Sequence, residues 1–394
     1  MYTVSEPFDD FPGSAAWDAE ERAFRAQIRR HLTDNRAPVF DRFDMKNSLV
    51  ETLAWHRRLA AAGFPLPVCP TELGGRPRSV ALQLVQAEEM AAVGANFSVN
   101  IVGISMLTPL LLALGSPEQQ ARWLPPVGRG EELWCQLFSE PEAGSDLFGM
   151  RTTAITDGVT LRVNGQKIWS STAEHADFGL MLARTEPGSA GKHGIGCFVV
   201  DMKSPGIDVR PIKQIGGSAE FAEVFFDDVT VPMTNVIGAP NDGATAALRV
   251  LAAERSGLTM GSYAVFAAQF RDVARLCAQR GTRGHRDALA KLWEALAVQR
   301  LNAIRQASAE TEEPIQLLAL AAAGKLRSGA LSVMMQDLRA ELLGMSAAAI
   351  DPDDHAAALG GERFVSSLGL SLGGGTHQMQ RNAIADGLLR MPRS

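Results

Sequence analysis

The chain of 394 residues is 46% hydrophobic and 21% charged, an ordinary globular composition for two or three domains. Its formal charge of -6 and its pI of about 5.7 provide no basic face for a phosphate backbone, so we expect no nucleic-acid partner. The cysteines are scattered singly, without a CxxC pair or zinc-ligand spacing, and we expect reduced, packed thiols, as suits a cytoplasmic protein. They are Cys69, Cys135, Cys197 and Cys277.

The N-terminal segment MYTVSEPFDDFPGSAAWDAEE is acidic and lacks the basic stretch and apolar core of a signal peptide. No stretch approaches the roughly 18 uninterrupted apolar residues of a membrane span. The longest candidate, residues 101–114, predicts a buried helix or helix pair instead, because four residues interrupt it. These are Gly103, Ser105, Thr108 and Pro109. We therefore expect no membrane insertion.

Residues 15–123 show helical periodicity, and residues 82–93 form one of the clearest predicted helices. Turn signals at residues 70–75 and at Gly115-Ser116-Pro117 separate the helices, and Ser116 is expected to cap a helix that begins with Pro117. One apolar helix face consists of Trp17, Phe24, Ile28 and Leu32.

Beyond about residue 132 the pattern changes to alternating, β-branched strands at 159–163, 178–183, 195–200 and 223–231. The dipeptides Asp157-Gly158 and Asn164-Gly165 favour tight hairpin turns, so we expect largely antiparallel strands. Helical periodicity returns at 244–267, 286–311 and 315–345. The sequence therefore predicts an α+β multi-domain protein, with a helical domain at 1–130, a β-barrel domain at 131–239 and a helical domain at 240–394.

Common nucleotide-binding and metal-binding patterns are absent. Gly194-Ile195-Gly196 begins a predicted strand instead of following one, and residues 188–192 have the wrong spacing for a phosphate-binding P-loop. The histidines form no HExxH pair, so we predict no metal site.

Three motifs in order carry a family resemblance: WCQLFSEPEAGSDLFGM at 134–150, NGQKIWSSTAEHADFGLMLART at 164–185 and LGGGTHQMQRNAIA at 372–385. Together with CPTELGG, SPEQQARWLPP and FFDDVTVP, they closely resemble the acyl-CoA dehydrogenase family along nearly the whole chain. The run VLAAERSG and the GGGT ending look most like actinobacterial members that act on bulky, branched or ring-bearing acyl-CoA esters. The resemblance implies bound FAD, an acyl-CoA substrate, an electron-transfer flavoprotein as acceptor and a dimer of dimers.

The resemblance also implies which residues hold the flavin. Gly144 and Ser145 suit close approach to pyrophosphate, and Ser145 is also matched to the substrate. Trp169 would cover the flavin while a neighbouring hydroxyl bonds near its reactive nitrogen. Taken alone, SEPEAGSD would be read as a turn and Trp169 as a core residue. The expected cofactor-binding residues are Gln136, Phe138, Ser139, Gly144, Ser145, Trp169, Ser170, Ser171, Thr376, His377 and Gln378.

Desaturation of a thioester requires a base for the α-proton, donors to the carbonyl oxygen and exclusion of water. Many family members carry the base as a Glu before the Gly-Thr of the last motif, where this chain has Gly374. Gly374 can only offer its backbone N–H, and Gly375 matches a position beside the thioester. Other members carry the base on a C-terminal helix, one residue before an arginine, which predicts Glu254 as base and Arg255 beside the substrate. The alternative is a solvated Glu254 in a local ion pair.

Two departures from the family pattern concern the flavin site, the first of them its dimer-crossing contact. The usual Arg followed by Phe-Gly is missing, and Arg280, Arg283 or Arg286 could replace that arginine. The glycine-rich segment before the last motif is replaced by LGMSAAAIDPDDHAAALGGERF. Two other functions therefore stay open: a non-catalytic subunit of a heterotetramer with a paralogous chain, and a flavin monooxygenase of the same fold.

Overall fold

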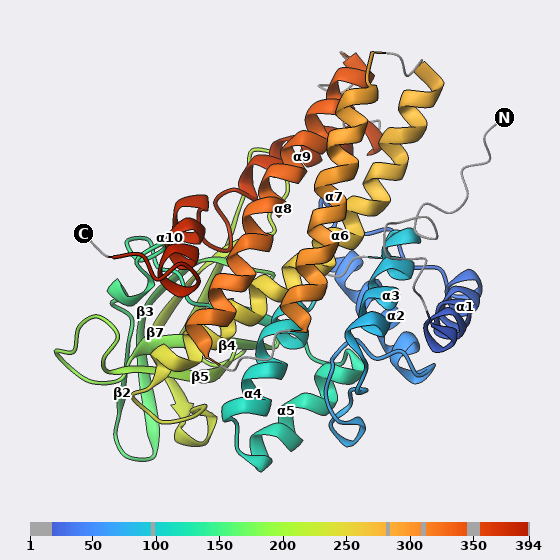
Figure 1. The fold of residues 1–394 in the computed structure, drawn as a ribbon. Helices are drawn as coiled ribbons and strands as arrows, with labels where there is room; N and C mark the ends of the chain where they lie inside the picture. Colours follow the sequence, from blue (N-terminus) through green and yellow to red (C-terminus); the bar gives the residue numbers. More distant parts are fainter. Residues whose placement is uncertain (1–17, 96–98, 281–283, 309–312, 345–354, 393–394) are drawn as a thin grey trace.

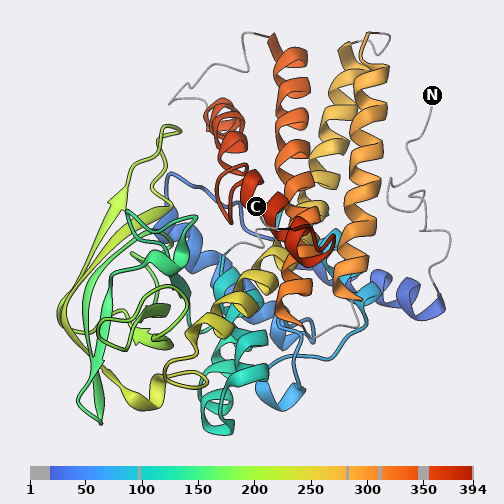
Figure 2. The same cartoon turned by 60° about the vertical axis from the view of Figure 1, so that its left-hand side comes forward.

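The computed structural model describes residues 18–95, 99–280, 284–308, 313–344 and 355–392. A β domain lies on one side, a bundle of long C-terminal helices stands beside it, and the N-terminal helices pack against both (Figures 1 and 2). The predicted order of helical, β and helical domains is confirmed.

The N-terminal helices begin where polar side chains cap them. Asp18 and Glu21 form a reciprocal capping box at the first helix, and Ser116 and Gln119 form another with Pro117 in the first turn, as predicted for that helix. Phe24, Ile28 and Leu32 do share a face toward the interior, whereas Trp17 lies outside the described residues. The helices are α1 (Ala19–Asp34), α2 (Met45–Ala61), α3 (Val80–Ala92), α4 (Thr108–Leu114) and α5 (Pro117–Arg129), with a short 3-10 turn at Thr71–Leu73.

The apolar segment predicted as a helix pair consists of a π-helix, Val102–Leu107, that runs directly into α4. The backbone N–H of Thr108 donates to the carbonyl of Gly103, five residues back, as the wider π turn requires, and the Thr108 hydroxyl donates to the same carbonyl at 2.8 Å. Leu107, Leu110 and Leu111 are buried in the core between the N-terminal helices and the β domain.

The β domain is one seven-stranded sheet with the order β1-β4-β2-β3-β7-β6, and β5 pairs with β4. Most pairs are antiparallel, as predicted, but β1 runs parallel to β4, and Thr153 of β2 pairs parallel with Arg184 of β4. The strands are β1 (Trp134–Leu137), β2 (Thr153–Thr156), β3 (Thr160–Ser171), β4 (Phe178–Arg184), β5 (Ile195–Asp201), β6 (Ile207–Ile212) and β7 (Phe221–Pro232). Short 3-10 turns lie at Leu147–Gly149 and Met233–Asn235.

Only one of the two predicted hairpin turns exists. Asp157-Gly158 joins β2 to β3, and Gly158 has the positive φ of 99° that such a turn needs. The prediction for Asn164-Gly165 is wrong, because this dipeptide lies inside β3, where the register against β7 shifts between Val163 and Gly165. Gly165 has a φ of 145°, which allows a β-bulge at this position, and the bulge bends the long strand.

The C-terminal part consists of α6 (Gly243–Arg280), α7 (Arg286–Ala307), α8 (Pro314–Leu343), α9 (His355–Gly369) and α10 (His377–Gly387). α6, α7 and α8 stand side by side (Figures 1 and 2). α8 is long and apolar enough to cross a membrane by composition, yet more than half of its apolar stretch is buried, and its residues pack into the core of the helix bundle. The four cysteines are unpaired and buried, as expected.

A buried ionic cluster fixes α3 against α1 and α6. The guanidinium of Arg25 donates to Glu88 at 2.5 Å and to Glu89 at 2.6 Å, and the Tyr263 hydroxyl of α6 donates to Glu88 at 3.0 Å. Charged, fully desolvated hydrogen bonds of this kind hold a single geometry. The cluster therefore sets the spacing between α3 and α6, which line the same cavity.

Candidate active site

A cavity of about 1890 Å³ lies where the three parts of the chain meet, and its lining comes from α3, the π-helix, β1, β3, α6 and the segment before α10. Of the residues predicted for cofactor, substrate or catalysis, twelve line it. They are Gln136, Phe138, Ser139, Gly144, Ser145, Trp169, Ser171, Glu254, Arg255, Gly374, Gly375 and Thr376.

Three predicted residues do not line the cavity. Ser170 lies between Trp169 and Ser171 on β3 but is 1% exposed, and it is not among the residues that line the cavity. His377 is the first residue of α10 and packs against Gly329 of α8, while Gln378 is exposed on the next position. Arg280 and Arg286 do not line the cavity either, and Arg283 lies outside the described residues.

The β-domain wall of the cavity carries an exposed aromatic ring. Trp169 has a φ of 59°, is 58% exposed and meets Phe221 edge to face with centroids 6.0 Å apart. A bulky residue in the left-handed region with its ring in the open is a strained arrangement that needs a functional reason. Hydroxyls of Ser139, Ser145 and Ser171 line the cavity around it. This donor set beside an aromatic face fits a large aromatic group that bears phosphates.

A buried ion pair holds the first motif in place beside that wall. The Lys167 ammonium donates to Glu140 Oε1 at 2.7 Å and to the carbonyl of Phe138 at 3.1 Å, and the Ile168 N–H donates to the Ser139 carbonyl at 2.9 Å. Burial lowers the pKa of Lys167 to about 8, against the opposing effect of Glu140. The segment with Phe138 and Ser139 is thus tied directly to β3.

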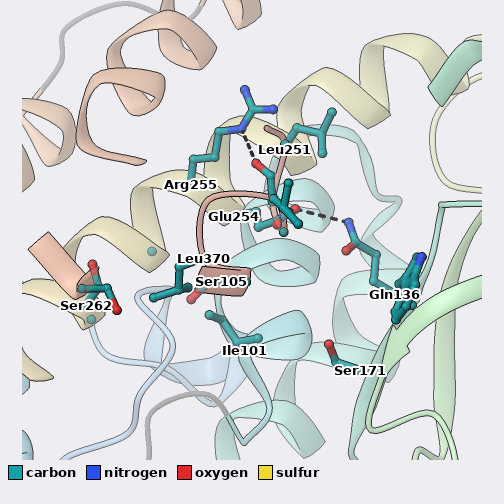
Figure 3. A pocket seen from close by; sticks show the side chains of 18 of the residues that line it. Ile101, Ser105, Gln136, Ser171, Leu251, Glu254, Arg255, Ser262 and Leu370 are labelled. Atoms are coloured by element: carbon teal, nitrogen blue, oxygen red, sulfur yellow. Dashed lines mark hydrogen bonds between the residues drawn. The ribbon is translucent and has the colours of Figure 1, made fainter. Parts of the chain in front are cut away.

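Glu254 lies on α6 with its carboxylate facing the cavity, and Gln136 of β1 donates to its Oε2 at 3.4 Å (Figure 3). Only 7% of the residue is exposed. Burial raises the pKa of Glu254 above its ordinary value, and the positive charge of Arg255, the hydrogen bond from Gln136 and the charge of Lys325 act in the opposite direction. A desolvated carboxylate of this kind is a stronger base than a solvated one.

Opposite α6, the segment before α10 turns through two left-handed glycines, Gly374 (φ 66°) and Gly375 (φ 87°). Gln380 of α10 donates to the carbonyls of both, at 3.0 and 2.9 Å, and Arg255 Nε donates to the Gly374 carbonyl at 3.4 Å. Within the described part of the chain, the N–H groups of Gly374 and Gly375 donate to no acceptor. Two backbone donors are therefore free on residues that line the cavity.

Arg255 is 6% exposed, and its Nη1 has no hydrogen-bond partner among the described residues. Because Arg255 also lines the cavity, this buried donor is available to an acceptor on a bound ligand. The role of Arg255 beside the substrate stays a prediction.

Two important residues were not predicted from the sequence. Gln380 is fully buried under the glycine turn, and Lys325 of α8 is 3% exposed and donates to the carbonyl of Leu370. The one sequence signal for Lys325 was a single cation inside the apolar run LLALAAAGKL, which is unusual for a core helix.

The far side of the cavity, from α3 to α6, combines small and apolar residues with a few polar ones such as Gln83 and Gln269. A Cβ on Gly261 would meet no atom within 4 Å, whereas a Cβ on Gly257 would lie 2.8 Å from Ser105. Ala87 and Met90 of α3 line the same region. This side offers space for a bulky apolar group next to Glu254.

Comparison with known protein families gives a match for each of the three parts of the chain. Residues 18–131 match the N-terminal domain of acyl-CoA dehydrogenases, residues 135–229 the middle domain and residues 241–389 the C-terminal domain. The chain belongs to the acyl-CoA dehydrogenase family. It is therefore an oxidoreductase acting on CH–CH bonds, in a family that depends on FAD. The family predicted from the three motifs is confirmed.

Among curated relatives, acyl-CoA dehydrogenase IpdE1 of Mycobacterium tuberculosis is 36% identical over 390 residues, covering 95% of this chain and 98% of the relative. IpdE1 of Mycolicibacterium smegmatis is 33% identical over 394 residues, covering 95% of this chain and 98% of the relative. Among solved structures, a chain of the ChsE4-ChsE5 complex from Mycobacterium tuberculosis is 26% identical with a TM-score of 0.82, covering 96% of this chain and 99% of that one.

Proposed function

We propose that this protein binds FAD in the described cavity and desaturates an acyl-CoA thioester, with Glu254 as the base that removes the α-proton. The observation that carries the proposal is the desolvated Glu254 carboxylate, facing the cavity opposite two free backbone donors. FAD, when bound, supplies the acceptor for the hydride that leaves the β carbon.

Each requirement of the reaction has a matching group in the chain. Glu254 accepts the proton, and the N–H groups of Gly374 and Gly375 donate to the thioester oxygen, where negative charge develops as the proton leaves. Burial of Glu254 and Arg255 keeps water away from the proton in transit. Phe138, Ser139, Ser145, Trp169, Ser171 and Thr376 would hold the cofactor, because they form the aromatic and hydroxyl-bearing wall.

The substrate that fits best is a bulky or ring-bearing acyl-CoA. Gly261 and Ala87 leave the acyl side of the cavity wide, whereas Gly257 lets α6 approach Ser105 closely. A solved relative at 25% identity is described as the Tcur3481-Tcur3483 steroid ACAD, which supports a polycyclic acyl group. An electron-transfer flavoprotein in the cytoplasm is the acceptor that family membership favours.

The assembly is proposed to be a dimer of dimers, either of this chain alone or with a paralogous subunit. The similar ChsE4 and ChsE5 were solved as a complex, which supports the second form. A purely non-catalytic role is disfavoured for this chain because it carries the cavity-facing Glu254. A monooxygenase of this fold would have no use for that base.

The test is flavin reduction by Glu254→Gln under anaerobic conditions, with a panel of acyl-CoA thioesters. The amide is nearly isosteric, so FAD content and thioester binding should persist, while the rate of flavin bleaching falls about 100-fold or more. Glu294→Gln, the same change at an exposed position of α7, is the matched control and should bleach normally. Near-normal reduction by Glu254→Gln would refute the assignment.

Adding Gly374→Glu to Glu254→Gln should restore part of the rate, because the family tolerates a base at that position. Full recovery is not expected, since Gly374 has a φ of 66° and a side chain there costs about 1–3 kcal/mol of backbone strain.

A further inference from the structure

Lys325 is a buried cation that the reaction scheme above does not use. It lies on α8, is 3% exposed, and its ammonium donates to the backbone carbonyl of Leu370. Among the described residues it forms no ion pair with any carboxylate. A desolvated ammonium with only a neutral acceptor costs free energy, so its position calls for a compensating role.

The acceptor of Lys325 belongs to the segment that carries the two free backbone donors. This glycine segment, residues 370–376, is held at three points by side chains from three helices. Lys325 of α8 binds its start at Leu370, whereas Arg255 of α6 and Gln380 of α10 bind the glycines. Loss of the first anchor would remove the hydrogen bond that ties the start of the segment to α8 and would misplace the N–H groups of Gly374 and Gly375.

Lys325 also interacts electrostatically with Glu254. Burial lowers the pKa of Lys325 to about 8, and the Glu254 carboxylate partly opposes this effect. In turn, the Lys325 charge is one of the effects that hold the pKa of Glu254 down against its burial. The other charged or titratable groups here are Arg255 from α6 and His377 and Arg381 from α10.

We propose that Lys325 is a positioning residue for the dehydrogenation, which anchors the glycine segment through Leu370 and supplies a buried positive charge that keeps Glu254 ionised. The inference rests on the proposed function, because it assumes that Glu254 is the base. Lys325 acts through other residues and touches neither substrate nor cofactor, since it does not line the cavity.

The sign of the pH effect follows from the charge. Glu254 works as a base only when ionised, so flavin reduction increases with pH through the pKa of Glu254. Removing a nearby positive charge raises that pKa and shifts the acid limb of kcat/KM to higher pH, by about 0.5–1 pH unit. On the acid limb this corresponds to a rate that is about threefold to tenfold lower. Below pH 8 Lys325 of the unaltered protein is mainly protonated, so the comparison is made there.

The experiment compares Lys325→Gln, Lys325→Arg and Arg327→Gln in the FAD-loaded protein, measuring the pH profile of kcat/KM for flavin reduction. Lys325→Gln keeps a hydrogen-bond donor without the charge, and its acid limb should be shifted to higher pH. Lys325→Arg keeps the charge, and its acid limb should match that of the unaltered protein. Arg327 is exposed two residues away on α8, so its removal is screened by water and should leave the profile unchanged. The double variant Lys325→Gln with His377→Gln tests whether a positive charge on His377 replaces the lost charge of Lys325.

The outcomes separate this inference from the proposed function. If Glu254→Gln is inactive and Lys325→Gln has an unshifted acid limb, the role of Lys325 is refuted and Glu254 stands. If Glu254→Gln reduces flavin normally, the base assignment fails first. Should Lys325→Gln fail to fold, Lys325→Met takes its place, because it also removes the charge, and an unshifted acid limb in that variant refutes the role of Lys325.

Discussion

Lys167 and Lys325 are both buried lysines, but their surroundings differ. Lys167 has a full ionic partner in Glu140, whose carboxylate also accepts from the N–H groups of Arg151 at 2.6 Å and Thr152 at 3.0 Å. The pair therefore organises the backbone of the cofactor motif on both of its sides. A buried pair in such a network costs little while it is complete and much when one member is removed.

Lys167→Met should accordingly destabilise the β domain by about 3–5 kcal/mol, because it leaves the Glu140 charge buried and unpaired. Thermal unfolding followed by circular dichroism and by flavin fluorescence should show both an earlier transition and earlier release of FAD. The double variant Lys167→Met with Glu140→Gln should recover part of the loss. Lys203→Met is the matched control, because its ion pair with Asp177 is exposed and exposed pairs contribute at most about 1 kcal/mol. Equal losses in Lys167→Met and Lys203→Met would contradict this account.

At the scale of elements, α6 contributes to the reaction site and to the acyl side of the cavity through different residues. It carries Glu254 and Arg255 at the reaction site, and further along it presents Gly257 and Gly261 to the acyl side of the cavity. Glycine inside a helix reduces stability, so two of them on one helix indicate a gain elsewhere. Here the gain is space, because a side chain at Gly261 would project into an open region.

Gly261→Leu should therefore exclude large acyl groups. We expect kcat/KM for a ring-bearing acyl-CoA to fall about tenfold or more, with a smaller loss for the shortest straight-chain thioester that the enzyme accepts. Gly261→Ala is the control: it should retain activity toward both and raise stability by about 0.5–1 kcal/mol, as expected for Gly to Ala in a helix. Equal losses of Gly261→Leu with both substrates would show that α6 does not limit the size of the acyl group.

The elements that the sequence predicted well are those with a strong local signal. Ser116 and Pro117 mark the start of α5, and the strands at 178–184 and 195–201 are continuous apolar runs. β1, β2 and β6 were not among the predicted strands: β1 and β2 have only four residues each, and β6 is too polar and exposed to show a clear pattern. Asn164-Gly165 misled because the same dipeptide suits a turn or a bulge, and only the pairing of β3 with β7 decides between them.

The residues of the candidate site also fall into those with a local sequence signal and those without one. Twelve of its residues came from motifs, because a motif records chemistry at adjacent positions in the chain. Ser170 came from the same motif as Trp169 but is buried and does not line the cavity. Lys325 and Gln380 could not be predicted, since their roles depend on α8 and α10 meeting residues 370–375, and such packing is not encoded in local periodicity.

At the scale of the whole molecule, exposed apolar side chains concentrate near the C-terminus, from α9 to the segment after α10. A monomeric soluble protein rarely leaves so many large apolar groups in water in one part of the chain. They are Phe364, Leu368, Leu370, Leu372, Met379, Leu388, Leu389 and Met391. We refer to them as the C-terminal apolar surface. Four of them, Leu368, Leu370, Leu372 and Met379, also line the cavity, so this surface connects the proposed assembly with the active site.

Leu389→Glu combined with Met391→Glu should therefore weaken assembly, because both side chains are more than half exposed in the single chain and would bring charge into an apolar interface. Light scattering should show an oligomer for the unaltered protein, alone or co-expressed with a paralogous subunit, and a lower mass for the double variant. Val159→Glu, at an exposed apolar position of the β2–β3 hairpin, is the control and should keep the full mass.

The double variant should also lose FAD more readily if the neighbouring chain completes the cofactor site, which flavin absorbance after gel filtration would measure. An unaltered protein that is monomeric, fully loaded with FAD and active would exclude this arrangement, and the cavity of a single chain would then have to be sufficient for catalysis.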